Sequence, residues 1–171
     1  RPLDRRPLTL LRGLPPIVDA GARVLVLGSF PSEASLAERH YYAHRRNQFW
    51  QMLSALTGRP LSEMDYAAKQ VAVRAAGLAI WDVYGRCERE GSLDSAIRNG
   101  RPNDFRRLTR LAPSLALVCF NGRTAARFAP VLEDLGYATA VLPSTSPAHA
   151  GMAFQAKLDA WRAALEPHLR R

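Results

Sequence analysis

Aromatic and cationic side chains alternate in the segment from Tyr41 to Trp50, which reads Tyr-Tyr-Ala-His-Arg-Arg-Asn-Gln-Phe-Trp. Aromatic rings stack on bases while cations hold the phosphate backbone, so this mixture is typical of nucleic-acid binding. The helical spacing of Phe49 and Trp50 assigns their rings to the protein core. Tyr42 and Asn47 are therefore the candidates for chemistry here, although an asparagine at this place is also a good helix cap.

Small polar residues follow four apolar runs that have the length of strands. These loops span residues 28–32, 81–84, 121–124 and 143–149. One such loop is most often only a turn. Four of them at the carboxyl edge of a parallel sheet favour a ligand site, because small residues admit a ligand to the backbone and exposed N–H groups hold a phosphate or a carbonyl oxygen.

Several other kinds of site are not indicated. The sequence contains no phosphate loop, no dinucleotide fingerprint and no Gly-x-Ser-x-Gly elbow. Cys87 and Cys119 lack the spacing of a zinc site, and His40 and His44 lie four apart but among tyrosines and arginines. A nuclease or phosphatase would require clustered carboxylates at the strand ends. We therefore expect neither a metal nor a cofactor.

The composition favours an acidic partner. The 171 residues include 24 Lys and Arg against 15 Asp and Glu, a net charge of +9, and the length fits one domain. No apolar run approaches the roughly 20 residues of a membrane span, and no secretory leader is recognisable. We expect DNA or RNA as the partner, no membrane contact, and a reduced cytoplasmic setting.

The apolar patterns predict alternating strands and helices, and hence a parallel sheet covered on both faces. Residues 1–19, with four prolines and several arginines, are expected to form a basic arm packed on a single domain of residues 20–171. The predicted strands are 23–28, 78–83, 115–120 and 138–142. The predicted helices are 47–57, 62–75 behind a Ser-Glu-Met-Asp capping box, 124–135 and 153–165, with helical periodicity in the remaining gaps.

Five blocks of the chain resemble the uracil-DNA glycosylase superfamily and, within it, the DNA-deoxyinosine (hypoxanthine-DNA) glycosylases. They are residues 28–35, 41–50, 78–83, 87–97 and 142–149, and the likeness runs in order from Gly13 to Trp161. The resemblance implies a three-layer α/β/α domain with a central, mostly parallel four-stranded sheet. It also implies a monofunctional enzyme, without a cofactor, that flips a deaminated base from DNA and hydrolyses its glycosidic bond to leave an abasic site.

The resemblance also assigns base-binding roles. Phe30 stands where many relatives carry the Asp or Asn that positions water, so Asn47 is implied to hold the attacking water instead. Tyr42 matches the ring on which the base stacks, and the backbone of Ser29 and Phe30 matches the donor to its carbonyl. Asp82 stands where uracil-specific relatives read the base with Asn; an ion pair with Arg86 is the alternative.

The remaining assignments concern DNA and the leaving group. Ser144 replaces a catalytic His or Asn of related uracil enzymes. The implied DNA contacts are Ser32, Arg45, Arg46, Thr145, Ser146, Pro147 and His149. Lys69 and Lys157 are expected on surface helices, which disfavours Schiff-base lyase chemistry.

Two other functions stay open at this stage. One is a broad-specificity enzyme that acts on uracil, xanthine and related lesions. The other is a basic α/β module that binds DNA or RNA without catalysis and has no need of Asn47. In each case we expect a monomer.

Overall fold

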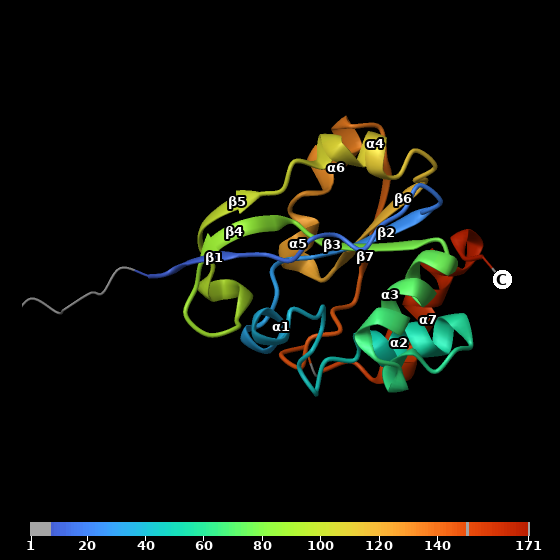
Figure 1. Cartoon of the computed structure of the whole chain (residues 1–171), viewed down its shortest axis with the longest axis horizontal. Helices are drawn as coiled ribbons and strands as arrows, with labels where there is room; N and C mark the ends of the chain where they lie inside the picture. Colours follow the sequence, from blue (N-terminus) through green and yellow to red (C-terminus); the bar gives the residue numbers. More distant parts are fainter. Residues whose placement is uncertain (1–7, 150, 171) are drawn as a thin grey trace, which may run out of the picture.

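The central feature of the computed structural model, which describes residues 8–149 and 151–170, is a parallel sheet of four strands in the order β3-β2-β6-β7 (Figure 1). The strands are β2 (Val24–Gly28), β3 (Leu78–Asp82), β6 (Leu117–Asn121) and β7 (Ala138–Leu142). In this register Gly28 faces Asp82, and Asn121 faces Leu142. The predicted three-layer α/β/α fold with a four-stranded parallel sheet is confirmed.

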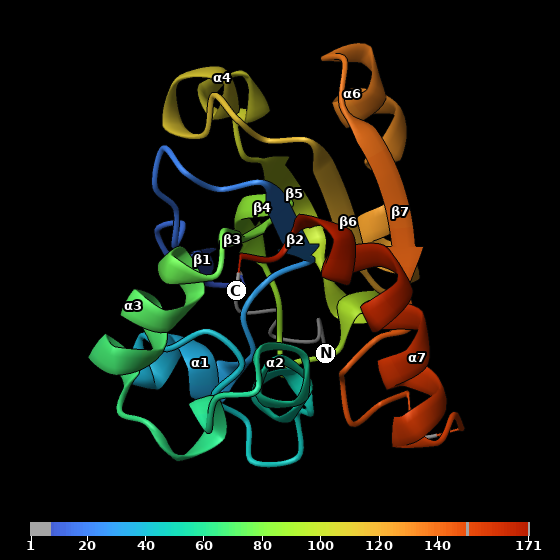
Figure 2. The ribbon, with the colours of Figure 1, turned by 90° about the vertical axis from the view of Figure 1, so that its right-hand side faces the viewer.

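Helices cover both faces of this sheet (Figure 2). One layer contains α2 (Phe49–Thr57), α3 (Tyr66–Ala75) and α7 (Phe154–Leu165), with α1 (Glu33–Glu38) beside it. The other contains α4 (Leu108–Leu111), α5 (Arg123–Ala126) and α6 (Ala129–Asp134). Short 3-10 helices are Leu61–Glu63, Asp94–Ala96, Phe105–Arg107 and Glu166–His168.

Strand β2 is apolar throughout because both of its faces are buried. Val24 and Val26 belong to the core beneath α2, α3 and α7, whereas Leu25 and Leu27 belong to the core on the other side. Alternate side chains of a strand point to opposite faces, so each of the two cores receives every second residue.

A second, antiparallel sheet was not predicted. It has the order β1-β4-β5, formed by β1 (Leu10–Arg12), β4 (Tyr84–Glu88) and β5 (Arg98–Pro102). The expectation of helical structure between the second and third parallel strands is therefore wrong for β4 and β5. Strand β4 pairs with β1, more than 70 residues away in sequence, and β5 pairs with β4. Periodicity along the chain cannot reveal such pairing.

Residues 8–19 lie against the rest of the molecule. Beyond β1, Leu14 and Ile17 are buried, and the backbone of Ile17 exchanges two hydrogen bonds of 2.9 Å with Ile80. The first seven residues of the expected arm lie outside the described part.

Three predicted helices differ in their bounds. The helix expected from residue 62 begins at Tyr66, because Asp65 caps it by accepting from the Ala68 N–H at 2.8 Å. The helix expected over 124–135 is broken into α5 and α6, since Pro130 has no N–H to donate to the preceding turn. The helix expected from residue 47 begins at Phe49.

Within the described residues, no helix has both the length and the apolar character that crossing a membrane would require.

Two valines of α3 offer a matched test of the core. Val73 is fully buried, whereas Val71 is 64% exposed. Val73→Ala should lower the free energy of unfolding by about 2 kcal/mol, from lost burial and the residual cavity. Val71→Ala should change it by less than about 0.5 kcal/mol, with alanine's helix propensity in its favour. Urea denaturation of both variants measures the difference; equal losses would contradict the described orientation of α3.

Candidate active site

A cavity of about 210 Å³ opens at the carboxyl edge of the parallel sheet. It is lined by residues from the loops after all four parallel strands, as expected from the topology. The structure brings the following predicted site residues to its wall: Ser29, Phe30, Ser32, Tyr42, Asn47, Asp82, Ser144, Thr145, Ser146 and Pro147. The other three, Arg45, Arg46 and His149, are exposed and are not part of the lining.

The carboxyl group of Asp82 lies at the buried end of the cavity. The residue is 4% exposed, and its Oδ2 atom finds no hydrogen-bond partner among the described residues. Burial, and secondarily the carboxylate of Asp94, raises the pKa of Asp82 to about 7, with a smaller opposing effect of Arg89. Near physiological pH, the protonated and the ionised forms of this carboxyl group are therefore both populated.

The predicted alternative for Asp82 is wrong. It placed Arg86 one helical turn away, but both residues lie on strands, β3 and β4. Arg86 is exposed, and no ion pair joins it to Asp82 in the described part of the chain.

Position 28 requires glycine because the side chains of Asp82 and Tyr42 both lie close to its Cα atom. A Cβ atom at this position would lie 2.6 Å from Asp82 Oδ1 and 2.7 Å from the Tyr42 hydroxyl oxygen. Both distances are shorter than any ordinary van der Waals contact. A side chain at position 28 would thus displace the two groups that the parallel register brings together.

The ring of Tyr42 is held on one side by the core. It stacks on Phe49 with ring centroids 3.9 Å apart and planes 18° apart, and its hydroxyl accepts a hydrogen bond from Asn121 Nδ2 at 3.3 Å. The backbone at Tyr42 is left-handed, with φ of 54°. Burial, then the Asp82 carboxylate, raises the pKa of Tyr42, which keeps the hydroxyl protonated.

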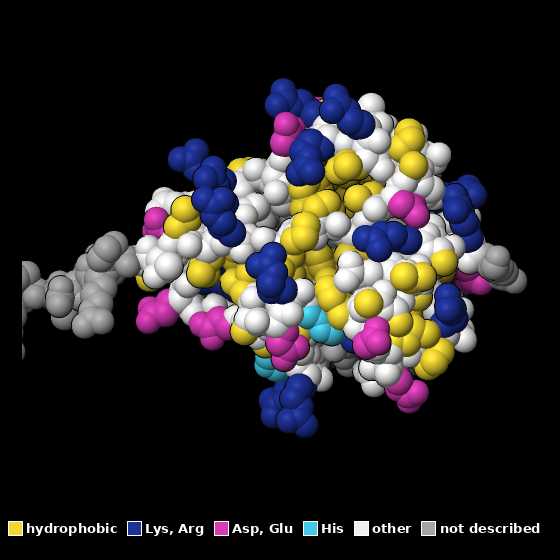
Figure 3. Space-filling model, viewed as in Figure 1, with side chains coloured by type: hydrophobic (Ala, Val, Ile, Leu, Met, Phe, Trp, Pro, Cys, Tyr) yellow, Lys and Arg dark blue, Asp and Glu magenta, His cyan; other side chains and the backbone are white. Residues whose placement is uncertain are grey.

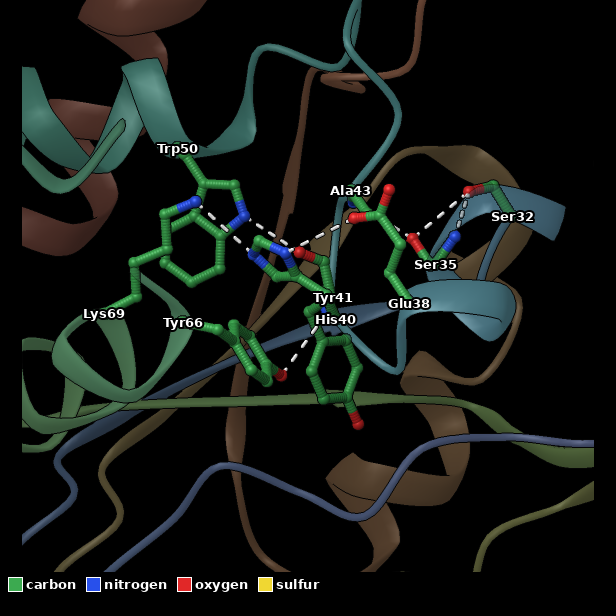
Figure 4. Close-up of polar contacts among 9 residues, drawn as sticks. All are labelled: Ser32, Ser35, Glu38, His40, Tyr41, Ala43, Trp50, Tyr66 and Lys69. Carbon is green, nitrogen blue, oxygen red and sulfur yellow. Dashed lines mark hydrogen bonds and ion pairs between the residues drawn. The ribbon is translucent and has the colours of Figure 1, made fainter. Parts of the chain in front are cut away.

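The preceding loop is fixed by hydrogen bonds to the Tyr41 backbone (Figure 4). Trp50 Nε1 donates to the Tyr41 carbonyl at 2.8 Å, and the Tyr41 N–H donates to the Tyr66 hydroxyl at 3.3 Å. His40 packs on Tyr66 and lies 3.4 Å from Lys69 Nζ; burial, then Lys69, lowers the pKa of His40. These contacts position the loop that carries Tyr42.

Asn47 lines the cavity just before α2. Its Oδ1 atom accepts a hydrogen bond from the Phe49 N–H at 3.0 Å, so the helix-capping alternative is correct for this oxygen. By backbone conformation, however, the capping residue of α2 is Gln48. This bond orients the side-chain amide, whose nitrogen is not needed by the helix. The N–H of Gln48 donates to the Thr145 carbonyl at 3.0 Å and joins this turn to the last loop.

The loop of residues 143–149 is anchored by a buried threonine. Thr145 is fully buried; its N–H donates to Asn121 Oδ1 and its hydroxyl accepts from Asn121 Nδ2, both at 3.0 Å. Asn121 ends β6 and contacts Tyr42 as well. Its loop was recognised in the sequence, but this residue was not singled out; its place at the end of a predicted strand was the available signal.

Helix α7 holds both ends of the same loop. Trp161 Nε1 donates to the Pro143 carbonyl at 2.9 Å, and Lys157 Nζ donates to the His149 carbonyl at 2.8 Å and to Gln48 Oε1 at 3.0 Å. The expectation that Lys69 and Lys157 lie on the surface is wrong: they are 7% and 1% exposed. Their long side chains pack inside, and burial lowers the pKa of each.

The turn between β4 and β5 forms the remaining part of the cavity wall. No residue of this turn was assigned to the site from the sequence. Ser29 Oγ donates to Asp94 Oδ1 at 2.6 Å, and the Glu33 N–H donates to Ser92 Oγ at 3.0 Å. Arg89, buried over the ring of Phe30, donates to the Pro31 carbonyl and to the Gly91 carbonyl. These bonds tie the turn to the loop after β2.

Ser32 has a local structural role. It caps α1, a helix that was not predicted, by accepting from the Ser35 N–H at 3.1 Å. Among the described residues, no group of three or more His, Cys, Asp or Glu side chains is placed to hold a metal ion. The cavity thus offers a stacking ring, an unpartnered carboxyl oxygen and an oriented amide.

Comparisons with known proteins agree with this architecture. The family model described as the uracil DNA glycosylase superfamily matches residues 15–170. A hypoxanthine DNA glycosylase of Methanosarcina acetivorans is 40% identical over 138 residues, covering 81% of this chain and 87% of the relative. The hypoxanthine DNA glycosylase of Methanosarcina barkeri is 36% identical with the same coverage.

A solution NMR structure of a Methanosarcina acetivorans protein assigned to the uracil DNA glycosylases superposes with a TM-score of 0.84. The two chains are 36% identical, and the alignment covers 93% of this chain and 98% of the other. The match extends over both helix layers and the sheet, not over one motif. The chain therefore belongs to the uracil DNA glycosylase superfamily.

Proposed function

We propose that this chain is a monofunctional DNA glycosylase of base-excision repair that removes a deaminated base, with hypoxanthine as the first substrate. The observation that carries this proposal is the cavity at the sheet edge, whose lining includes Asp82, a buried carboxyl group with an unpartnered Oδ2. The cavity's volume of about 210 Å³ suits one flipped base. The names of the two relatives support hypoxanthine.

The base is read by stacking and by one carboxyl group. Tyr42 offers a ring that Phe49 supports from behind, and the backbone of Ser29 and Phe30 is proposed to donate to a base carbonyl. Hypoxanthine presents a ring N–H next to a C=O. A neutral Asp82 can accept from this N–H and donate to this C=O, whereas an ionised Asp82 can only accept.

The filled pocket favours the neutral form of Asp82. A base that displaces water removes solvent from a carboxyl group that is already buried and lies near Asp94. Both effects disfavour a second negative charge. The acid form is accordingly the one that we assign to base recognition.

Asn47 is proposed to hold the attacking water. An amide is not a strong base, so it contributes orientation while the sugar gains oxocarbenium character. The oxygen of the water bonds to C1′ while the N-glycosidic bond breaks and its electrons pass to the departing base. The base then takes up the proton that the water loses. Ser144, on the opposite loop, lines the same space and is proposed to assist the leaving base.

The proposed chemistry is hydrolysis without a lyase step. A lyase needs a free amine at C1′, and no lysine lines the cavity in the described part of the chain. Water, DNA and the side chains named here suffice, so we propose a monomer that needs no metal or cofactor. Because the proposed substrate is DNA, we propose that the protein acts at the nucleoid in the cytoplasm.

The outer loops are proposed to hold the DNA backbone. Ser146, Pro147 and Ser32 line the cavity, and Arg45, Arg46 and His149 are exposed. Thr145, predicted as a DNA contact, is fully buried and supports this loop from within instead. The net charge of +9 supplies a general attraction for phosphate. Uracil and xanthine present the same N–H and C=O edge, which makes a broader substrate range the second candidate.

Asn47→Ala should slow single-turnover excision of hypoxanthine from end-labelled DNA by about 10²-fold or more, because the attacking water loses its orientation. DNA affinity should change little. Uracil and xanthine substrates measured alongside rank the three bases.

The alanine change also removes the bond from Asn47 Oδ1 to the Phe49 N–H, which costs about 1 kcal/mol of stability. Asn47→Ser is the control, since a serine hydroxyl caps a helix but lacks the amide. It should be as stable as wild type and as slow as Asn47→Ala. Retained excision in either folded variant would refute the catalytic assignment.

The excision rate should fall as the pH rises through about 7, because Asp82 then loses the proton that it donates to the base. Asp82→Asn keeps a donor and an acceptor without titration, so its rate should be flat over this range. Pre-steady-state rates between pH 5.5 and 8.5, about one and a half units to either side, measure both. A wild-type rate that rises with pH would assign base recognition to the carboxylate instead.

The same substitution should change stability in a defined direction. The Asp82 carboxyl group keeps its proton up to about pH 7 when folded but releases it near 3.8 when unfolded. Wild-type stability therefore falls between these pH values. Asp82→Asn should stabilise the fold more at pH 8 than at pH 5, as measured by urea denaturation.

A further inference from the structure

The small antiparallel sheet carries three arginines in one row across its three strands. Arg12 of β1 is directly opposite Arg86 of β4, and Arg86 pairs with Arg101 of β5, with an irregularity of the β4–β5 register on either side of this pair. Residues directly opposite in an antiparallel pair project to the same face. All three are exposed, and Figure 3 shows basic side chains standing out over this part of the molecule.

This arrangement is unfavourable for the isolated protein. Like charges directly opposite one another destabilise a sheet. In the described part of the chain, no ion pair joins a carboxylate to Arg12, Arg86 or Arg101. Glu88, the nearest acidic residue along β4 on this face, accepts a hydrogen bond from Asn99 instead.

Burial of the opposite face of this sheet explains why the three arginine side chains point to solvent. Cys87 is fully buried and its neighbour Leu11 is partly buried, so the intervening residues of β1 and β4 must face solvent. Arg86 and Arg101 line an open groove together with Leu10, Glu88 and Pro102. Two arginines of the row thus stand in a groove that also contains the carboxylate of Glu88, and in the described part of the chain this carboxylate forms no ion pair with them.

The dimensions of the row suit a nucleic-acid backbone. Neighbouring strands lie about 4.8 Å apart, so three arginines span on the order of 10 Å. One DNA strand carries one phosphate per base step, so a row of this length meets about two to three successive phosphates. Guanidinium groups bind phosphate with two parallel hydrogen bonds.

We propose that Arg12, Arg86 and Arg101 form a second contact surface for the DNA backbone, outside the excision cavity. The surface is rigidly connected to the site, since β4 follows β3 after Val83 and the turn after β4 lines the cavity. It would hold DNA flanking the lesion without reading its sequence. The inference shares with the proposed function only the assumption that DNA is the partner.

The test compares the triple variant Arg12→Gln, Arg86→Gln, Arg101→Gln with wild type. Affinity for a lesion-free duplex of about 30 base pairs, roughly 100 Å at 3.4 Å per step, is measured over a range of salt concentrations. The slope of log affinity against log salt should become shallower by about 2 to 3, at about 0.9 for each lost phosphate contact. For a duplex of about 8 base pairs carrying the lesion, too short to occupy both sites, the difference should be much smaller.

The matched control is Arg59→Gln, Arg74→Gln, Arg110→Gln, which makes the same change of net charge on other elements. Its slope should change by less than about 1. An equal change in both variants, or none in the first, would overturn the inference and leave an acidic protein or lipid surface as the partner of the row.

Two further measurements distinguish this inference from the proposed function. Without DNA, the triple variant should unfold at the same or a higher temperature than wild type; a lower temperature would mean that the row stabilises the sheet. Single-turnover excision at saturating DNA should equal that of wild type. If wild type excises no base yet the salt slopes differ as expected, the surface stands and the proposed function fails.

Discussion

The parallel pairing of β2 with β3 is the constraint on which the site depends. It places Asp82 beside Gly28, where the missing Cβ leaves room for a carboxyl group and for the Tyr42 hydroxyl. The carboxyl group is buried by the strands and loops around it, and burial is the largest cause of its raised pKa. One register therefore places this carboxyl group at the wall of the cavity and contributes to its burial.

The loops at this edge are held by rigid elements, which is how irregular backbone can present a shaped cavity. Asn121 at the end of β6 joins Tyr42 to Thr145, and α7 holds the last loop through Lys157 and Trp161. The two bonds from α7 end on backbone carbonyls, so they define the path of the last loop. Such support limits the reorganisation required when a base enters.

Charge is divided between the interior of the site and its surroundings. The cavity contains polar groups and the titratable carboxyl group of Asp82, while the exposed arginines, such as Arg45, Arg46 and those of the small sheet, lie outside its lining. This separation suits a ligand whose base is uncharged and whose backbone is anionic. Under the proposed function, the base enters a region of low dielectric, and the phosphates stay in solvent where cations bind them at little desolvation cost.

Local sequence pattern was enough to locate the four parallel strands, α2, α7 and the loops that form the site, because burial on both faces and helical spacing leave a direct trace in residue type. The β1-β4-β5 sheet, the burial of Lys157 and the roles of Asn121 and Asp94 left no such trace. Each depends on contacts between segments distant in sequence. The family likeness indicated Asp82 as a site residue, but only its packing beside Gly28 and Asp94 decided that it holds a proton near neutral pH.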